Sequence, residues 1–212
     1  MLTGHNQADP FRGLVEVIVS GDGAAAIRLL EASPQLARAR AAQGATRQAP
    51  NQNFFDQVLH YMYVGDSALH MAAAAYQPLV VEQLIAMGAD VRARNKRGAE
   101  PLHYAVDGGP GLPAWNPGAQ SKIIAILIGA GADPNAVDKS GVAPLHRAVR
   151  NRCAGAVEAL IDGGADPHAP NRNGSTPVLL ATHNTGKTGS GSTEAKAQQE
   201  QILRILEDRG AS

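Results

Sequence analysis

A short unit of turn and helices recurs along this chain, and its spacing restricts the fold more than any other feature. Within residues 139–171, a Ser-Gly turn precedes a helix that begins at Pro144, and Gly163-Gly164 ends a second helix. Proline suits the first helical position, where its missing N–H costs nothing, and glycine suits a helix C-terminus, where a left-handed conformation is needed. This stretch therefore predicts two short helices separated by a tight break.

The landmarks of this unit return at regular steps. Leu69-His70, Leu102-His103, Leu145-His146 and Val178-Leu179 are 33, 43 and 33 residues apart, and each is followed by Gly-Ala-Asp or Gly-Ala. A period of this length indicates a solenoid, in which each repeat packs only on its neighbours. The apolar stripes of the second helices, including Leu127 and Leu160, are expected to be buried between adjacent repeats.

A turn followed by two helices at a period of 33 residues resembles the ankyrin repeat, here in a bacterial-type form with long insertions between helices. The strings that carry the resemblance are SALHMAA, EPLHYAV, APLHRAV and STPVLLA. The resemblance covers residues 11–40 and 65–212 and implies an all-α ankyrin-repeat solenoid with finger-like β-turns. We expect a single domain, 1–212, with repeats at about 11–40, 65–95, 96–138, 139–171 and 172–212 and an insert at 41–64.

Residues 41–64 do not fit the repeat. Residues 41–53 are small and polar and predict a loop, whereas the next eleven residues read FFDQVLHYMYV. Their apolar positions match a short amphipathic helix: Phe54, Phe55, Val58, Leu59 and Met62. Such a helix either extends the core of the first repeats or walls part of a binding groove, because an exposed apolar patch would otherwise be a liability.

Two repeats are lengthened by loops between their helices. The 43-residue step contains ten extra residues around GGPGLPAWNPG, and the 46-residue step before Gly210-Ala211 contains thirteen around NTGKTGSGSTEAKAQQE. Both insertions enter at equivalent points, so we expect them to emerge along one edge of the solenoid. Insertions on one face of a solenoid often mark the binding face.

Composition excludes several classes of protein. The formal net charge is zero, which argues against a general surface for nucleic acid or anionic membrane. The single cysteine, Cys153, excludes an intramolecular disulfide. The N-terminal residues lack the basic start and apolar run of a secretory signal, and no apolar stretch of about 18 residues exists. We expect a cytoplasmic monomer.

Two patterns resemble sites of chemistry. Residues 181–188, ATHNTGKT, match a relaxed phosphate loop, in which Lys187 and Thr188 would contact phosphate and Mg²⁺. A helix rather than a strand precedes this string, which favours a flexible loop, and a nucleotide-binding enzyme acting through Gly186–Thr188 is the least favoured alternative.

The recurring His70, His103 and His146 lie one repeat apart, too far to share a zinc ion. The resemblance implies that they hydrogen-bond backbone between repeats. We expect no metal, no cofactor and no enzyme.

The remaining candidates form a binding surface. The resemblance implies that partners meet the finger turns and the solvent face of each first helix. The first-helix candidates are Met71, Ala74, Tyr104, Asp107, Arg147 and Arg150, and the finger candidates are Arg94, Lys96, Arg97, Asp138, Lys139, Asn171 and Arg172. Tyr104, Arg147 and Arg150 are preferred because Tyr and Arg are favoured as interface anchors. Four cations within 92–97 form either a solvated turn or a surface for an acidic partner.

The leading prediction is a non-catalytic protein–protein interaction module. A second alternative arises because seven of the eight aromatic residues lie between Phe54 and Trp115. These rings could instead line a pocket for a small ligand or peptide, near Tyr61, Tyr63, Tyr104 and Trp115. A closed aromatic cavity would favour that sensor, and an ordered loop at Gly186–Thr188 would favour the enzyme.

Overall fold

The structure is an all-α solenoid of stacked helix pairs. The computed structural model describes residues 9–46, 51–183 and 191–211. The pairs are α1 (Pro10–Val19) with α2 (Gly23–Ala32), α3 (Ala68–Ala74) with α4 (Pro78–Ala86), α5 (Pro101–Ala105) with α6 (Pro117–Gly129), α7 (Pro144–Arg150) with α8 (Ala154–Asp162), and α9 (Pro177–Thr182) with α10 (Thr193–Asp208). A 3₁₀ turn, η1 (Pro34–Ala37), follows the first pair. In the part of the chain that is described, no helix is long and apolar enough to cross a membrane.

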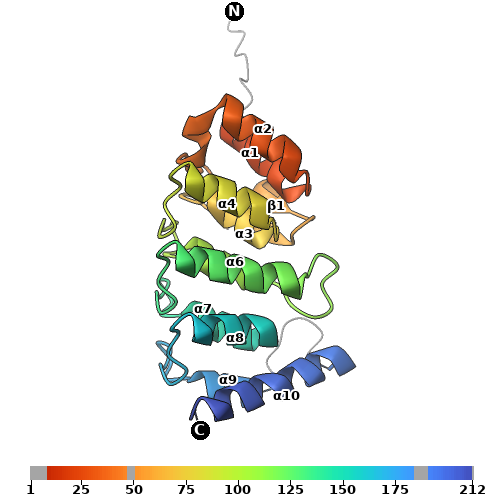
Figure 1. Cartoon of the computed structure of the whole chain (residues 1–212), viewed down its shortest axis with the longest axis vertical. Coiled ribbons are helices and arrows are strands. Elements are labelled where there is room, and N and C mark those ends of the chain that lie inside the picture. Colours follow the sequence, from red (N-terminus) through yellow and green to blue (C-terminus); the bar gives the residue numbers. More distant parts are fainter. Residues whose placement is uncertain (1–8, 47–50, 184–190, 212) are drawn as a thin grey trace, which may run out of the picture.

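The pairs stack along the long axis of the molecule, with the N-terminal pair at one end and the C-terminal pair at the other (Figure 1). First helices pack on first helices, and second helices pack on second helices, as in α3 with α5 and α6 with α8. Leu127 and Leu160 are completely buried between these layers, which confirms the repeat phase read from the sequence. The turns between pairs lie along one edge in Figure 1, and the loop between α5 and α6 lies at the opposite edge.

The recurring histidines tie each pair to the next. Each Nδ1 accepts a hydrogen bond from the backbone N–H three residues earlier, and each Nε2 faces a backbone carbonyl of the following turn. These bonds are Ser67 N–H to His70 (3.1 Å), Glu100 N–H to His103 (3.1 Å) and Ala143 N–H to His146 (3.3 Å), with the carbonyls of Ala99, Val142 and Ala169 at 3.1, 3.1 and 2.9 Å. Because Nδ1 accepts, Nε2 carries the proton and donates. The structural role expected for these histidines is therefore confirmed.

These histidines make the stability of the fold sensitive to acid. Burial lowers the pKa of His70, of His146 and of His103, the last to about 4. The unfolded chain takes up protons below about pH 6.5, where the folded chain resists them, so the stabilisation is complete above that pH and falls as the pH decreases toward 4. We expect the urea midpoint to be lower at about pH 5 than at about pH 7. The decrease should be smaller in His103→Asn, and an equal decrease in that variant would contradict the assignment.

One first helix lacks a capping side chain. Thr176 caps α9 because its Oγ1 accepts a hydrogen bond from the backbone N–H of Leu179 at 3.3 Å. The equivalent residue before α7 is Ala143, whose backbone is extended as a cap requires (φ −86°, ψ 162°). We therefore expect Ala143→Thr to raise the free energy of unfolding by about 0.5–2 kcal/mol. Urea denaturation followed by circular dichroism measures this, and a lowered midpoint would show that the hydroxyl does not reach the helix.

The insert is a hairpin, so the predicted amphipathic helix over 54–62 is wrong. After a 3₁₀ turn, η2 (Asn51–Asn53), strands β1 (Phe54–Phe55) and β2 (His60–Tyr61) pair antiparallel. The rings of Phe54 and Tyr61 lie opposite each other with centroids 4.7 Å apart. Cross-strand aromatic pairs stabilise hairpins, whereas a helix of so few residues is marginal on its own. The hairpin packs on the first helices of the second and third pairs, which decides the shape of the site.

The finger turns share one construction. In each, an Asn or Asp Oδ1 accepts hydrogen bonds from the backbone N–H groups two and four residues later, at 2.8–3.1 Å; these residues are Asn95, Asp138 and Asn171. The residue three positions on is a glycine with φ between 70° and 78°, as at Gly98, Gly141 and Gly174. A side chain would strain the backbone there. The fingers therefore present equivalent positions to solvent, of which Arg97, Ser140 and Asn173 form one column.

Candidate functional site

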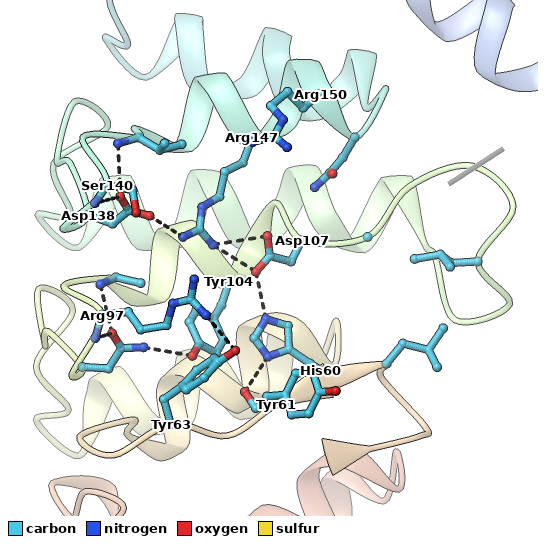
Figure 2. A pocket seen from close by; sticks show the side chains of 17 residues that line it. His60, Tyr61, Tyr63, Arg97, Tyr104, Asp107, Asp138, Ser140, Arg147 and Arg150 are labelled. Atoms are coloured by element: carbon cyan, nitrogen blue, oxygen red, sulfur yellow. Dashed lines mark hydrogen bonds and ion pairs between the residues drawn. The ribbon is translucent and has the colours of Figure 1, made fainter. Parts of the chain in front are cut away.

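A cavity of about 460 Å³ opens between the hairpin, two finger turns and the first helices α5 and α7. We call it the bowl. The hairpin contributes Leu59, His60 and Tyr61, and Tyr63 follows the hairpin. The two fingers contribute Asn95, Arg97, Ala99, Asp138, Ser140 and Val142. Helix α5 and the loop after it contribute Tyr104, Asp107, Gly108 and Leu112, and α7 with the next residue contributes Arg147, Arg150 and Asn151. These residues come from three stretches that are remote in sequence, 59–63, 95–112 and 138–151, and Figure 2 shows their labelled side chains converging.

Arg147 bridges two carboxylates across the bowl. Its Nη1 lies 3.2 Å from Asp107 Oδ2 and its Nη2 lies 2.7 Å from Asp138 Oδ2 (Figure 2). The Arg147 side chain is 19% exposed. Burial by itself would raise the pKa of both carboxyls. Arg147 acts against burial, together with His60 at Asp107 and with backbone N–H groups at Asp138, so the pKa of each aspartate is lowered. Both aspartates are therefore ionised at neutral pH and are occupied by the protein's own cation.

His60 anchors the hairpin to the same cluster. Its Nε2 lies 2.9 Å from Asp107 Oδ2, and its Nδ1 lies 2.8 Å from the backbone oxygen of Tyr61. Both neighbours accept hydrogen bonds, so both ring nitrogens donate and the imidazole is protonated. Burial opposes this charge, but the Asp107 carboxylate overcomes it and raises the pKa of His60. The contribution of His60 to stability is complete below about pH 6.5 and is lost as the pH rises through that raised pKa.

Tyr104 does not lie on a solvent face, so its predicted role as an exposed anchor is wrong. It is 1% exposed, and the His60 ring covers it with centroids 4.3 Å apart. Its hydroxyl donates to Asp66 Oδ2 at 2.8 Å and accepts from Asn95 Nδ2 at 2.9 Å. The hairpin, which lies outside the repeat pattern, has converted this helix face into core, and Tyr104 forms the floor of the bowl.

The same covering removes two other first-helix candidates from the surface. Met71 is completely buried and Ala74 is 6% exposed. Val58 and Leu59 of the hairpin line the same small cavity as Ala74. Of the first-helix candidates, the structure therefore brings Asp107, Arg147 and Arg150 to the bowl with at least part of each side chain accessible.

The cationic finger divides into two directions. Arg92 lies 3.5 Å from Asp133 Oδ2, and Arg94 lies 3.1 Å from Glu100 Oε1 while its Nη2 donates to the carbonyl of Val137 at 2.8 Å. These two side chains join adjacent fingers. Lys96 is exposed and lies outside the bowl, as do the other finger candidates Lys139, Asn171 and Arg172. Arg97 alone of the four turns into the bowl, where its Nη1 donates to the Tyr63 hydroxyl at 2.9 Å.

The aromatic residues do not line one closed cavity. Trp115 borders a separate space of about 20 Å³, which is about the size of one water molecule. Its Nε1 donates to Gln120 Oε1 at 3.2 Å. Tyr61, Tyr63 and Tyr104 line the bowl, whereas Trp115 does not, so the single pocket predicted between Tyr104 and Trp115 is not formed. The phosphate-loop string lies largely outside the described residues, which end at His183 and resume at Gly191.

The remaining groups that could support chemistry are the Cys153 thiol and possible metal ligands. Cys153 is buried, its thiol donates to the carbonyl of Gly108 at 3.1 Å, and burial raises its pKa to about 12. It is therefore protonated and unreactive at neutral pH. Within the described ranges, no group of three His, Cys, Asp or Glu residues could hold a metal ion.

Sequence reasoning missed His60 and Ser140, and it named Tyr63 only in the aromatic pocket of the sensor alternative. His60 belongs to the insert, where no repeat landmark indicates a partner, and the histidine argument considered only copies at one repeat position. Ser140 could have been found, because it occupies the same finger position as Arg97. The signal for His60 was the aromatic density of the insert, which indicated a wall but not its direction.

Comparison with known proteins agrees with this architecture. The ankyrin repeat family model matches residues 64–96 and 97–139, and a model for many copies of the ankyrin repeat matches residues 127–181. Together these matches span more than half of the chain. A search of curated proteins finds no match. Residues 64–181 include α3 to α8 and every residue that lines the bowl except Leu59, the two residues of strand β2 and Tyr63. The repeats, the stacked helix pairs and these matches together show that the chain belongs to the ankyrin repeat family.

Proposed function

We propose that this protein is a non-catalytic interaction module that binds another protein, with an acidic surface, through the bowl and the finger turns beside it. Ankyrin repeats generally serve as protein–protein interaction modules. The observation that carries the proposal is the bowl itself: a pre-formed cavity of about 460 Å³ whose floor, Tyr104, is buried and hydrogen-bonded and whose rim carries exposed Arg97, Ser140 and Arg150. Pre-formed sites bind more tightly because less ordering is required on association.

The arrangement of charges supports binding rather than acid–base chemistry. A general base needs a free lone pair near the proton it removes. Both carboxylates of the bowl are bound to Arg147, and His60 has both nitrogens engaged as donors. These groups hold the hairpin, α5 and α7 together and leave the rim to meet a partner.

The finger column offers a matched test of this proposal. Ser140 lies on the rim of the bowl, and Asn173 is the equivalent exposed residue of the next finger, outside the bowl. A tryptophan at position 140 should fill the cavity without altering its charge. We expect Ser140→Trp to weaken partner binding at least about tenfold, equal to about 1.4 kcal/mol, and Asn173→Trp to leave it nearly unchanged.

The partner is first captured from the native cell on the immobilised protein and identified by mass spectrometry. Affinities of the purified partner for wild type and both variants are then measured by titration calorimetry, with circular dichroism as the folding control. Equal affinity of wild type and Ser140→Trp would show that the bowl is not the binding site. Equal losses in both variants would assign the interaction to the fingers in general.

A further inference from the structure

We propose that the bowl is a carboxylate-binding pocket, in which Arg97 and Arg150 receive an acidic side chain from an extended segment of the partner. This inference rests on the proposed function and adds the chemistry of the group that enters. The occupant is thus a stretch of protein that carries Asp or Glu beside apolar residues. The argument depends on charge, on the way Arg97 is held, and on the rim.

The charges that line the bowl do not balance. Two carboxylates, Asp107 and Asp138, face four basic side chains. Arg147 contacts both carboxylates, and His60 shares Asp107. The other two basic side chains, Arg97 and Arg150, form no ion pair with any residue that the structure describes. The side chains that line the cavity therefore carry an excess of two positive charges, which favours an anionic group.

Arg97 is positioned without being neutralised. Its guanidinium lies over the Tyr63 ring, 4.9 Å from the centroid, and one nitrogen donates to the Tyr63 hydroxyl at 2.9 Å. Neither contact removes the charge. An arginine has five N–H donors in a fixed plane, so the remaining donors can meet the two oxygens of a carboxylate. The stacking on Tyr63 lowers the cost of ordering this side chain when a ligand binds.

Arg150 lies on the opposite wall. It follows Arg147 by three residues, so the two side chains share one face of α7 (Figure 2). Arg147 is held by its two ion pairs and is only 19% exposed, whereas Arg150 is exposed. Arg147 also occupies the aspartates that would otherwise attract Arg150, so Arg150 keeps its donors for a ligand. Carboxylates with two arginine partners form strong, charge-assisted hydrogen bonds.

Apolar side chains at the rim favour a peptide over an isolated anion. Leu59 at the tip of the hairpin is 46% exposed, and Leu112 of the loop between α5 and α6 lies near it, because both also line the small space beside the bowl. Leu59 adopts a positive φ of 48°, which is uncommon for a side chain of this kind. A small anion would leave both leucines unused. Apolar residues that flank a Glu in a partner segment would cover them.

The test uses a fluorescent peptide with capped ends in which Glu alternates with Leu, and a twin peptide in which Gln replaces Glu. Binding to the full chain is followed by anisotropy at low salt. We expect saturable binding of the Glu peptide, and at least about tenfold weaker binding of the Gln peptide. Arg97→Gln with Arg150→Gln should cause a similar loss. Arg28→Gln with Arg204→Gln, exposed on α2 and α10 at the two ends of the stack, is the matched control and should retain binding within about twofold.

Three results would overturn the carboxylate pocket. The Gln peptide could bind as well as the Glu peptide, the control variant could lose as much affinity as the bowl variant, or millimolar inorganic phosphate could compete as well as unlabelled Glu peptide. The first would mean that the carboxylate is not recognised, the second that binding is non-specific attraction, and the third that a small anion is the occupant. Unchanged melting curves for both variants exclude misfolding as the cause.

This test can fail independently of the proposed function. If Ser140→Trp abolishes binding of the captured partner while Arg97→Gln with Arg150→Gln does not, the bowl binds protein but not through a carboxylate. If both variants retain full affinity, the proposed function and the pocket fall together.

Discussion

Replacing Tyr104 with alanine is expected to lower the free energy of unfolding by about 3–5 kcal/mol, the range for removing a large aromatic side chain from a core. Tyr104 is 1% exposed, and its ring packs on those of His60 and His70, with centroids 4.3 Å and 4.9 Å away. The substitution also removes the hydroxyl that donates to Asp66, a carboxylate with no exposed surface. Urea denaturation at neutral pH, followed by circular dichroism and by the fluorescence of the single tryptophan, measures the loss.

A more conservative variant separates the two causes. Tyr104→Phe keeps the ring and removes only the hydroxyl, so it leaves Asp66 Oδ2 and Asn95 without one partner each. We expect it to cost about 1–3 kcal/mol, less than the alanine variant. If Tyr104→Ala costs less than about 1 kcal/mol, the hairpin does not cover Tyr104 in solution. For the same reason, Tyr104→Ala is unsuitable for a binding experiment. Combined with Arg147→Ala it would perturb folding as well as binding, so a loss of affinity in that double variant would not identify an interface.

Leu127→Ala and Leu160→Ala should each lower the free energy of unfolding by about 2–5 kcal/mol. Both side chains are completely buried, on α6 and α8, which pack on each other. Each repeat is stabilised by its neighbours, so a cavity between two layers weakens the coupling that keeps the stack cooperative. The measurement is the same urea titration, with the slope examined for loss of cooperativity.

The matched control is the same substitution at an exposed position. Leu79 on α4 is 64% exposed, so Leu79→Ala should change the free energy of unfolding by about 0.5 kcal/mol or less. Losses of similar size at Leu79 and Leu127 would contradict the assigned repeat phase, because only burial between layers distinguishes the two leucines.

The sequence by itself determined the architecture of this protein. Its period, its Pro and Gly boundaries and its recurring Leu-His pairs were enough to predict the stacked helix pairs, the burial of Leu127 and Leu160, and the structural role of His70, His103 and His146. These features are readable because they are local and repeated: one repeat contacts the next in the same way, so a pattern found in one copy is checked by the others.

The tertiary structure decided the site. Residues 54–62 satisfied a helical pattern but form a hairpin, because a stretch this short takes its conformation from the surface it packs on, and Phe54 pairs with Tyr61 only when that surface holds the strands together. His60 and Asp107 are 47 residues apart, and Arg147 and Asp107 are 40 apart. No spacing in the sequence encodes such pairs. The hairpin buried Tyr104 and turned Arg97 inward, so the exposure of single side chains followed from a contact between the one non-repeating segment and the solenoid.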